Sequence, residues 1–299
     1  MSLRTKSGLF LIALMAICVS GLWAFQWPVD SRVLTATFGE SRWDHFHTGI
    51  DIGGGAQKVR PVESGEVVYY QDGAAREGTP PSGLGTFLVI EHERGIRSLY
   101  AHLEPGSVSE LPPHVGLDTV IGTIGDTGAS LGKHLHLEII DSEIGSYVNP
   151  LLVLPSLPDT VTPDIKSVRY VSDDADEETQ PVPLVRGARV PSGEHRLLIE
   201  LYDRSEYVAY FCPMSPYRIT GFINGSEAFD FTMDSLSEKN GELVIGRGNA
   251  TTSFADLYHD DWVVESGPIP FRVGEIQLEI VARDLVGNEA SLRIPVTVQ

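Results

Sequence analysis

Short runs of strand-forming residues, separated by Gly, Pro and Asp, occupy the chain from residue 25 to about residue 154. They fall at residues 33–38, 62–70, 87–92, 97–103, 120–124 and 134–140. No stretch here shows a sustained helical period, and the residues between the runs are typical of turns. The pattern predicts an all-β fold with a mostly antiparallel sheet in residues 25–154. Two long connections, residues 72–85 and 104–119, could wall a groove.

A second set of strand-like runs follows a linker at residues 155–164, which contains three prolines. These runs fall at residues 197–202, 217–223, 228–233, 276–282 and 292–298. Asn224-Gly225 is a hairpin signal between two of them. The last two runs, with Gly287-Asn288 between them, resemble the final strands of bacterial immunoglobulin-like modules. We therefore expect residues 165–299 to form an immunoglobulin-like β-sandwich, in which Asp284 and Asn288 stabilise a turn rather than bind calcium.

The first 24 residues have the layout of an export signal. Arg4 and Lys6 precede an apolar run at residues 8–19, and Ser20-Gly21-Leu22-Trp23 leads to Ala24. This order predicts a signal peptide at residues 1–24 and a mature protein in the periplasm or cell envelope. An uncleaved anchor is the alternative, because residues 8–25 are just long enough to span a bilayer. Lipidation of Cys18 is disfavoured by the large Ile17 before it.

The mature chain is acidic and has few cysteines. Without Arg4 and Lys6, 20 basic residues face 41 acidic ones, a formal net charge of −21. This charge disfavours nucleic acid, teichoic acid and anionic lipid as partners, so membrane contact is expected only through the N-terminal segment. Cys212 alone remains of the two cysteines once the signal is removed, so no intramolecular disulfide is expected.

Histidines and one aspartate recur at spacings that suit a metal site. His134 and His136 are two apart in a strand-like run, so both imidazoles point to one face, about 6.6 Å apart along the backbone. His47 and Asp51 would lie about 13 Å apart in a straight strand, so one ion could bind both only if the chain bends, and Gly49 is placed to permit a bend. His102 ends another run. Taken singly, each of these signals is weak.

Together, these residues and the motifs around them resemble the lysostaphin and LytM type of zinc peptidoglycan endopeptidases. The resemblance covers about residues 27–150. Its parts occur in the family's order: Phe38-Gly39, residues 46–52, 65–68, 85–92, 100–103, 121–128 and 134–139, and Asn149-Pro150.

The resemblance implies a zinc ion held by His47, Asp51 and His136, with water in the fourth position. It implies that His102 and His134 are the catalytic pair that activates the water and stabilises the oxyanion. The implied activity is that of an exported zinc metalloendopeptidase that hydrolyses peptide cross-links of bacterial peptidoglycan.

Two other functions remain open. One is a non-catalytic envelope regulator that binds and activates another cell-wall hydrolase. The other is a structural envelope protein in which the sandwich carries the function and the N-terminal β domain only binds the wall. The sequence leaves open which cross-link is cut and what residues 165–299 do. Of the remaining histidines, His45 is not expected to bind the metal, His92 is expected to be structural, and the others are expected at the surface: His114, His195 and His259.

Overall fold

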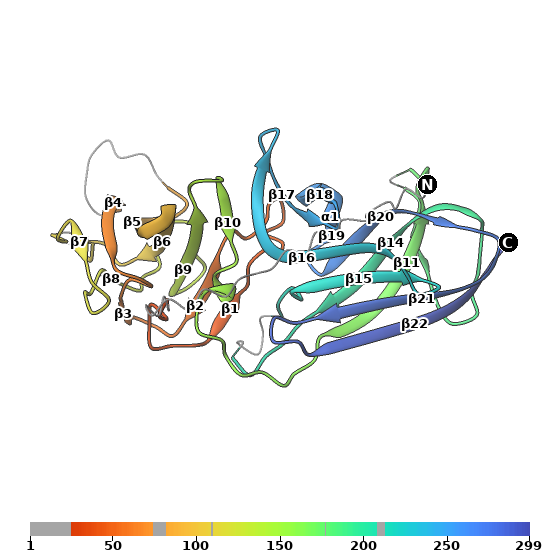
Figure 1. The fold of residues 1–299 in the computed structure, drawn as a ribbon, viewed down its shortest axis with the longest axis horizontal. Coiled ribbons are helices and arrows are strands. Elements are labelled where there is room, and N and C mark those ends of the chain that lie inside the picture. The colour runs from red at the N-terminus through yellow and green to blue at the C-terminus, as the bar shows by residue number, and fades with distance from the viewer. Residues whose placement is uncertain (1–24, 74–81, 109, 177, 208–212) are drawn as a thin grey trace, which may run out of the picture.

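Strands make up almost all of the regular structure (Figure 1). The computed structural model describes residues 25–299 except 74–81, 109, 177 and 208–212. Strands account for 52% and helices for 4%, which confirms the all-β fold. The expected export signal, Cys18, Cys212 and most of the long connection at residues 72–85 lie outside the described residues. Among the residues that are described, no helix has the length and apolar character that a membrane span requires.

The N-terminal part, residues 25–154, is an antiparallel sheet. The strands that build it run in the spatial order β10-β9-β6-β5-β4-β7, with β2 also paired to β9 and β1 paired to β2. Their bounds are β1 Leu34–Ala36, β2 Ile50–Gly53, β4 Gly65–Gln71, β5 Thr86–Glu91, β6 Ile96–Leu103, β7 His114–Val115, β9 His134–Asp141 and β10 Ser146–Val148. β3 (Lys58–Val59) and β8 (Gly122–Thr123) form a small separate pair, and two single 3₁₀ turns lie at Glu93–Gly95 and Pro150–Leu152.

The alternation of side chains along β9 explains why the polar face of this sheet can carry a site. Leu135 and Leu137 are fully buried in the hydrophobic core. Because successive residues of a strand point to opposite faces, His134, His136 and Glu138 lie together on the other face. The core therefore fixes the strand that positions the two histidines.

The C-terminal part, residues 164–299, contains two groups of strands that lie one over the other in Figure 1. One has the order β13-β22-β21-β15-β16 and the other the order β12-β11-β14-β20-β19, while β17 and β18 extend from β16. The bounds are β11 Asp164–Ser172, β12 Val182–Pro183, β13 Arg189–Val190, β14 Gly193–Tyr202, β15 Arg218–Ile223, β16 Ser226–Lys239, β17 Glu242–Arg247, β18 Ala250–Ser253, β19 Tyr258–Asp260, β20 Val263–Phe271, β21 Gly274–Arg283 and β22 Glu289–Val298. A single short helix, α1 (Phe254–Leu257), stands among the residues described here.

Two turns in this part confirm what the sequence indicated. Asn224 and Gly225 both have positive φ, 50° and 80°, which is the backbone of a type I′ hairpin. Asp284 accepts hydrogen bonds from the backbone N–H of Gly287 and Asn288 and from the Asn288 side chain. All these contacts close the turn between β21 and β22.

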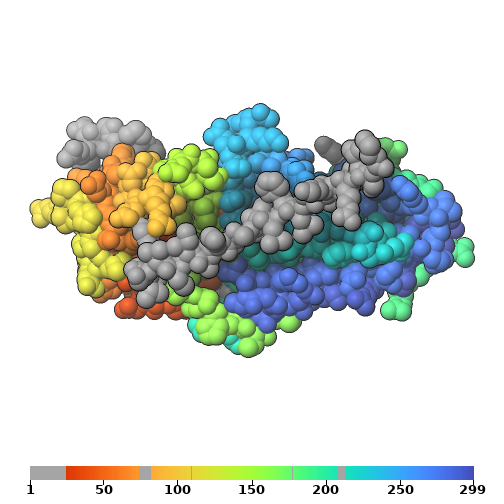
Figure 2. All heavy atoms as spheres, in the orientation of Figure 1, coloured from red at the N-terminus to blue at the C-terminus, as the bar shows by residue number. Residues whose placement is uncertain are grey.

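The two parts are joined by a shared sheet and a shared core. β10 pairs with β16 in antiparallel register, Ser146 opposite Ser237 and Val148 opposite Ser235. Asn149 extends the junction, because its backbone N–H donates to the Asp234 carbonyl at 2.9 Å. One hydrophobic cluster includes buried residues of both parts. In Figure 2 the surface atoms of the two parts adjoin.

Candidate metal centre

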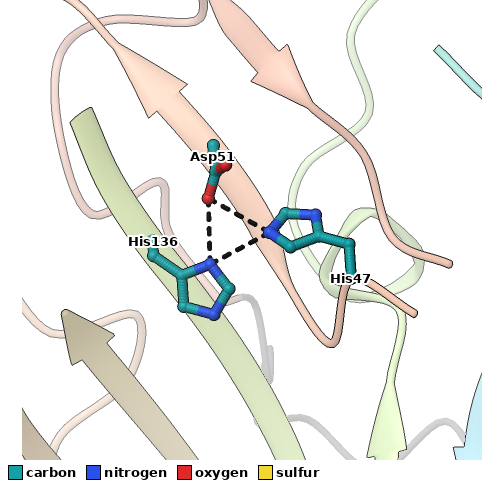
Figure 3. A group of neighbouring side chains, drawn as sticks. All are labelled: His47, Asp51 and His136. Atoms are coloured by element: carbon teal, nitrogen blue, oxygen red, sulfur yellow. Dashed lines mark hydrogen bonds and ion pairs between the residues drawn. The ribbon is translucent and has the colours of Figure 1, made fainter. Parts of the chain in front are cut away.

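Three side chains from different segments converge on one point (Figure 3). His47 lies on the loop before β2, Asp51 on β2 and His136 on β9. His47 Nε2 is 3.2 Å from Asp51 Oδ1 and 3.0 Å from His136 Nδ1, and His136 Nδ1 is 2.9 Å from Asp51 Oδ1. All three residues are buried, with exposed fractions of 5–8%. The structure thus brings together the metal ligands that the sequence resemblance implied.

The second ring nitrogen of each ligand histidine is held by a hydrogen-bond acceptor. His47 Nδ1 is 2.8 Å from the Thr37 carbonyl oxygen, and His136 Nε2 is 3.1 Å from Glu138 Oε1. A carbonyl or carboxylate oxygen can only accept, so each of these nitrogens carries the proton. When a metal ion takes the place of any proton at the common centre, His47 Nε2 and His136 Nδ1 can therefore turn lone pairs towards it.

Asp51 is oriented in the same way through its other oxygen. Arg42 Nη2 donates to Asp51 Oδ2 at 2.8 Å, while Arg42 Nη1 lies 3.2 Å from Glu40 Oε1. Oδ1 therefore faces the two ligand histidines. Thr48 Oγ1 completes the outer contacts by donating to Glu138 Oε1 at 2.5 Å.

The electrostatics of the cluster favour a cation. Burial lowers the pKa of His136, but hydrogen bonds to the Asp51 and Glu138 carboxylates outweigh burial and raise it to about 9. Burial would raise the pKa of Asp51, yet the two imidazoles hold it well below its usual value. Burial lowers the pKa of His47, so its ring stays neutral near pH 7. Two carboxylates therefore stabilise positive charge at a buried point where a neutral imidazole also offers a lone pair.

The donor set fits zinc. Tetrahedral zinc binds His nitrogen and carboxylate oxygen at about 2.0–2.2 Å, which places neighbouring ligand atoms about 3.3 Å apart. The three ligand atoms, all within 4.8 Å of one another, are separated by 2.9–3.2 Å. A site with three protein ligands also leaves a fourth position for water or substrate, as catalytic zinc sites do.

His102 and His134 lie beside the cluster but outside it. Their ring centroids are 4.7 Å apart, and the His102 ring is 5.9 Å from that of His136. Each Nδ1 is 2.7 Å from a backbone carbonyl oxygen, that of Thr127 for His102 and that of Gly132 for His134. Each Nε2 is therefore unprotonated in the neutral ring, and His134 Nε2 is 3.7 Å from Asp51 Oδ1. Burial lowers the pKa of His102, which keeps it neutral near pH 7. The division of roles between this pair and the three ligands stays a prediction.

The chain bends between His47 and Asp51, but Gly49 serves that bend differently than expected. Its backbone is not left-handed; the glycine is needed because β9 passes too close for a side chain. A Cβ at position 49 would lie 2.3 Å from the Leu137 carbonyl oxygen and 3.1 Å from His136 Cε1. The bend thus depends on close approach of two backbones.

Gly49→Ala is expected to destabilise the chain, because a backbone carbonyl cannot move away cheaply. We expect the free energy of unfolding to fall by about 1–3 kcal/mol, the cost of overpacking a core. Chemical denaturation of the full chain would measure this. Gly246→Ala is the matched control, since a Cβ at Gly246 would meet no atom within 4 Å and the backbone there has no left-handed φ. Equal midpoints for both variants would contradict the steric account.

The other histidines lie away from the centre. His45 is exposed and its Nδ1 is 2.6 Å from Asp44 Oδ1. His92 is buried and structural, since its ring nitrogens contact the Ser64 carbonyl and Ser98 Oγ. The expectation of an exposed His195 was wrong: its exposed fraction is 3%, and it packs against Tyr170 and Phe271. His195 is buried because these two aromatic rings on neighbouring strands cover it.

Two outer residues of the site escaped the sequence reasoning. Glu138 could have been found, because it continues the two-residue period of His134 and His136 on the same face of β9. Arg42 gave no such signal, since only the folded loop brings it to Asp51.

Comparisons with known proteins assign the two parts differently. Residues 45–150 match the family model described as Peptidase family M23. Residues 162–299 match a second family model, whose description names no fold or activity. The immunoglobulin-like character of residues 165–299 therefore stays a prediction.

Individual relatives cover the N-terminal part. Over 119 residues the chain is 35% identical to the DD-carboxypeptidase/endopeptidase Mpg of Neisseria meningitidis, a match that covers 40% of this chain. It spans about a quarter (25%) of that relative's length. A zinc containing peptidase from Vibrio cholerae is 27% identical, with 45% of this chain and 41% of that chain covered and a TM-score of 0.36. The SpoIIQ-SpoIIIAH pore forming complex contains a chain 26% identical, with 44% and 90% covered and a TM-score of 0.36.

Proposed function

We propose that the chain is an exported zinc metalloendopeptidase that hydrolyses peptide cross-links of bacterial peptidoglycan, and the match of residues 45–150 to the model of peptidase family M23 supports this. The observation that carries this proposal is the convergence of His47 Nε2, Asp51 Oδ1 and His136 Nδ1, each oriented by a second contact. The layout of residues 1–24 supports export to the periplasm or envelope.

Zinc bound by these three residues would act as a Lewis acid that polarises the scissile carbonyl and acidifies the attacking water. The chain's own contribution is proton transfer and charge stabilisation. His102 and His134 each present a basic Nε2, because their Nδ1–H groups are fixed on backbone carbonyls. One imidazole can accept the proton of the attacking water and return it to the leaving amine, while the other, once protonated on Nε2, donates a hydrogen bond to the developing oxyanion.

His102 itself has a left-handed backbone, with φ of 58°. Such a conformation is uncommon for a residue other than glycine and is typical of functional positions. It supports a role for His102 in turnover.

The substrate class is a wall peptide. The Neisseria relative is named a DD-carboxypeptidase/endopeptidase, and we propose a directly cross-linked wall rather than glycine bridges as this chain's substrate. The acidity of the mature chain is in keeping with a partner that is not strongly anionic.

The test is incubation of the zinc-loaded full chain with purified diaminopimelate-type and glycine-bridged peptidoglycan, followed by mass spectrometry of the released fragments. We expect cleavage of peptide bonds that stops on chelation and returns with zinc. A parallel sample with the chelator present throughout is the control. If zinc binds stoichiometrically and neither wall is cut, the peptidase proposal fails and a regulator of another hydrolase replaces it.

A further inference from the structure

The loop from Thr37 to His47 folds back on the ligand that ends it. The Thr37 carbonyl accepts from His47 Nδ1, the Gly39 N–H donates to the His47 carbonyl at 2.8 Å, and the His47 N–H donates to the Glu40 carbonyl at 2.9 Å. Backbone groups of this loop thus contact both the ring and the main chain of His47. The position of the loop therefore sets where His47 Nε2 lies.

The other side of this loop is held by the C-terminal part. The Tyr258 hydroxyl donates to the Gly39 carbonyl at 2.9 Å, and Ser41 Oγ is 3.1 Å from Asp261 Oδ1. A Cβ at Gly39, where φ is 79°, would lie 2.6 Å from Met233 Sδ. Glycine at position 39 lets the methionine pack directly on the loop backbone.

Phe46, the residue before the ligand His47, also packs against the C-terminal part. Phe46 has an exposed fraction of 1%, and its ring lies edge-on to those of Phe254 and Tyr258, with centroids 5.4 and 6.0 Å away. Phe254 is the first residue of α1, and Tyr258 directly follows its last residue. Both belong to the C-terminal part. Aromatic pairs in this geometry each contribute beyond the apolar area that they bury.

We propose that Tyr258, with Phe254 and Met233, is a positioning residue for the metal ligand His47, so that the C-terminal part is an integral support of the metal centre. This inference rests on the proposed function only in taking zinc as the metal. Zinc–ligand distances tolerate shifts of only about 0.2 Å, so a loop that relaxes by more than this weakens the site. These contacts of the C-terminal part are made to the loop that ends at His47. A domain that served only as a passive spacer would not need them.

The experiment measures zinc affinity in the full chain by competition with a chromogenic chelator. Tyr258→Phe keeps the ring and loses the hydrogen bond to Gly39, and we expect zinc affinity to weaken about threefold. Tyr258→Ala also removes the ring, and we expect a loss of about tenfold, at the lower end of the effect of outer residues on metal sites. The visible spectrum of the cobalt-substituted variants should shift, because the ligand geometry changes.

Phe271→Ala is the matched control. Phe271 is equally an aromatic residue of the C-terminal core, with an exposed fraction of 2%, but its ring neighbour is His195 rather than the loop. This variant should lower the unfolding temperature and keep the zinc affinity and cobalt spectrum of the parent chain.

If both Tyr258 variants bind zinc and cobalt like the parent chain while unfolding at a lower temperature, Tyr258 is merely a core residue and the proposal is overturned. If the parent chain binds zinc but cuts no wall, only the proposed function fails, and the affinities still decide the positioning role. A parent chain that binds no zinc would overturn both.

Discussion

His136→Ala is expected to abolish stoichiometric zinc binding. The variant loses one of three protein ligands and leaves Glu138 without the imidazole that it orients. Removal of outer residues alone costs about 10–100-fold in metal affinity, so loss of a ligand should cost at least about 100-fold. Elemental analysis after dialysis against a weak chelator would show zinc near one equivalent in the parent chain and near none in the variant.

The control for this experiment is His45→Ala. His45 is close in sequence to His47, but it is exposed and contacts Asp44 rather than the cluster. The His45→Ala variant should therefore bind zinc like the parent chain. Full zinc occupancy in His136→Ala would remove His136 from the ligand set and with it the assignment of the centre.

His134→Ala is expected to keep its zinc and lose turnover. His134 Nε2 faces the site from beside the ligands, and its Nδ1 is fixed by the Gly132 carbonyl, so the substitution removes a proton acceptor or oxyanion donor and leaves the three ligand atoms in place. General acid–base groups contribute about 10²–10⁴-fold to rate, and a loss in this range is expected. The measurement is fragment release from peptidoglycan per zinc-loaded protein.

His114→Ala serves as the control for this second variant, because His114 is exposed on β7 and should leave both zinc content and rate unchanged. Zinc loss in His134→Ala equal to that in His136→Ala would mean that both histidines of β9 are ligands.

Several strands were readable from the sequence, because alternation and turn residues are local signals, but β2, β11 and β20 were not predicted. Residues 134–140, for example, correspond to β9, His134–Asp141. β16 was predicted at residues 228–233 but spans Ser226–Lys239. Its far half carries polar residues, and it extends because β10 and β17 pair with it there. That pairing joins segments far apart in sequence, which no local pattern reveals.

The three metal ligands were predicted from the order of the sequence motifs, whereas the residues that orient them were not. His47, Asp51 and His136 were found because their spacing and context resembled a known family. Arg42 and Tyr258 act through contacts that exist only after folding, one across a loop and the other across the junction of the two parts. Residue type and spacing carry no information about such contacts.

The sheet shared by the two parts also affects the order in which contacts can form during folding. β10 has an open edge until β16 pairs with it, and β16 begins only at Ser226. The loop before His47 likewise gains its hydrogen bond from Tyr258 only when that residue is present, and Tyr258 lies more than two hundred residues further along the chain. Contacts between such distant segments form late, since the entropy of closing a long loop must first be overcome. A chain emerging from its N-terminus would therefore hold the loop before His47 in its final position only after Tyr258 had emerged.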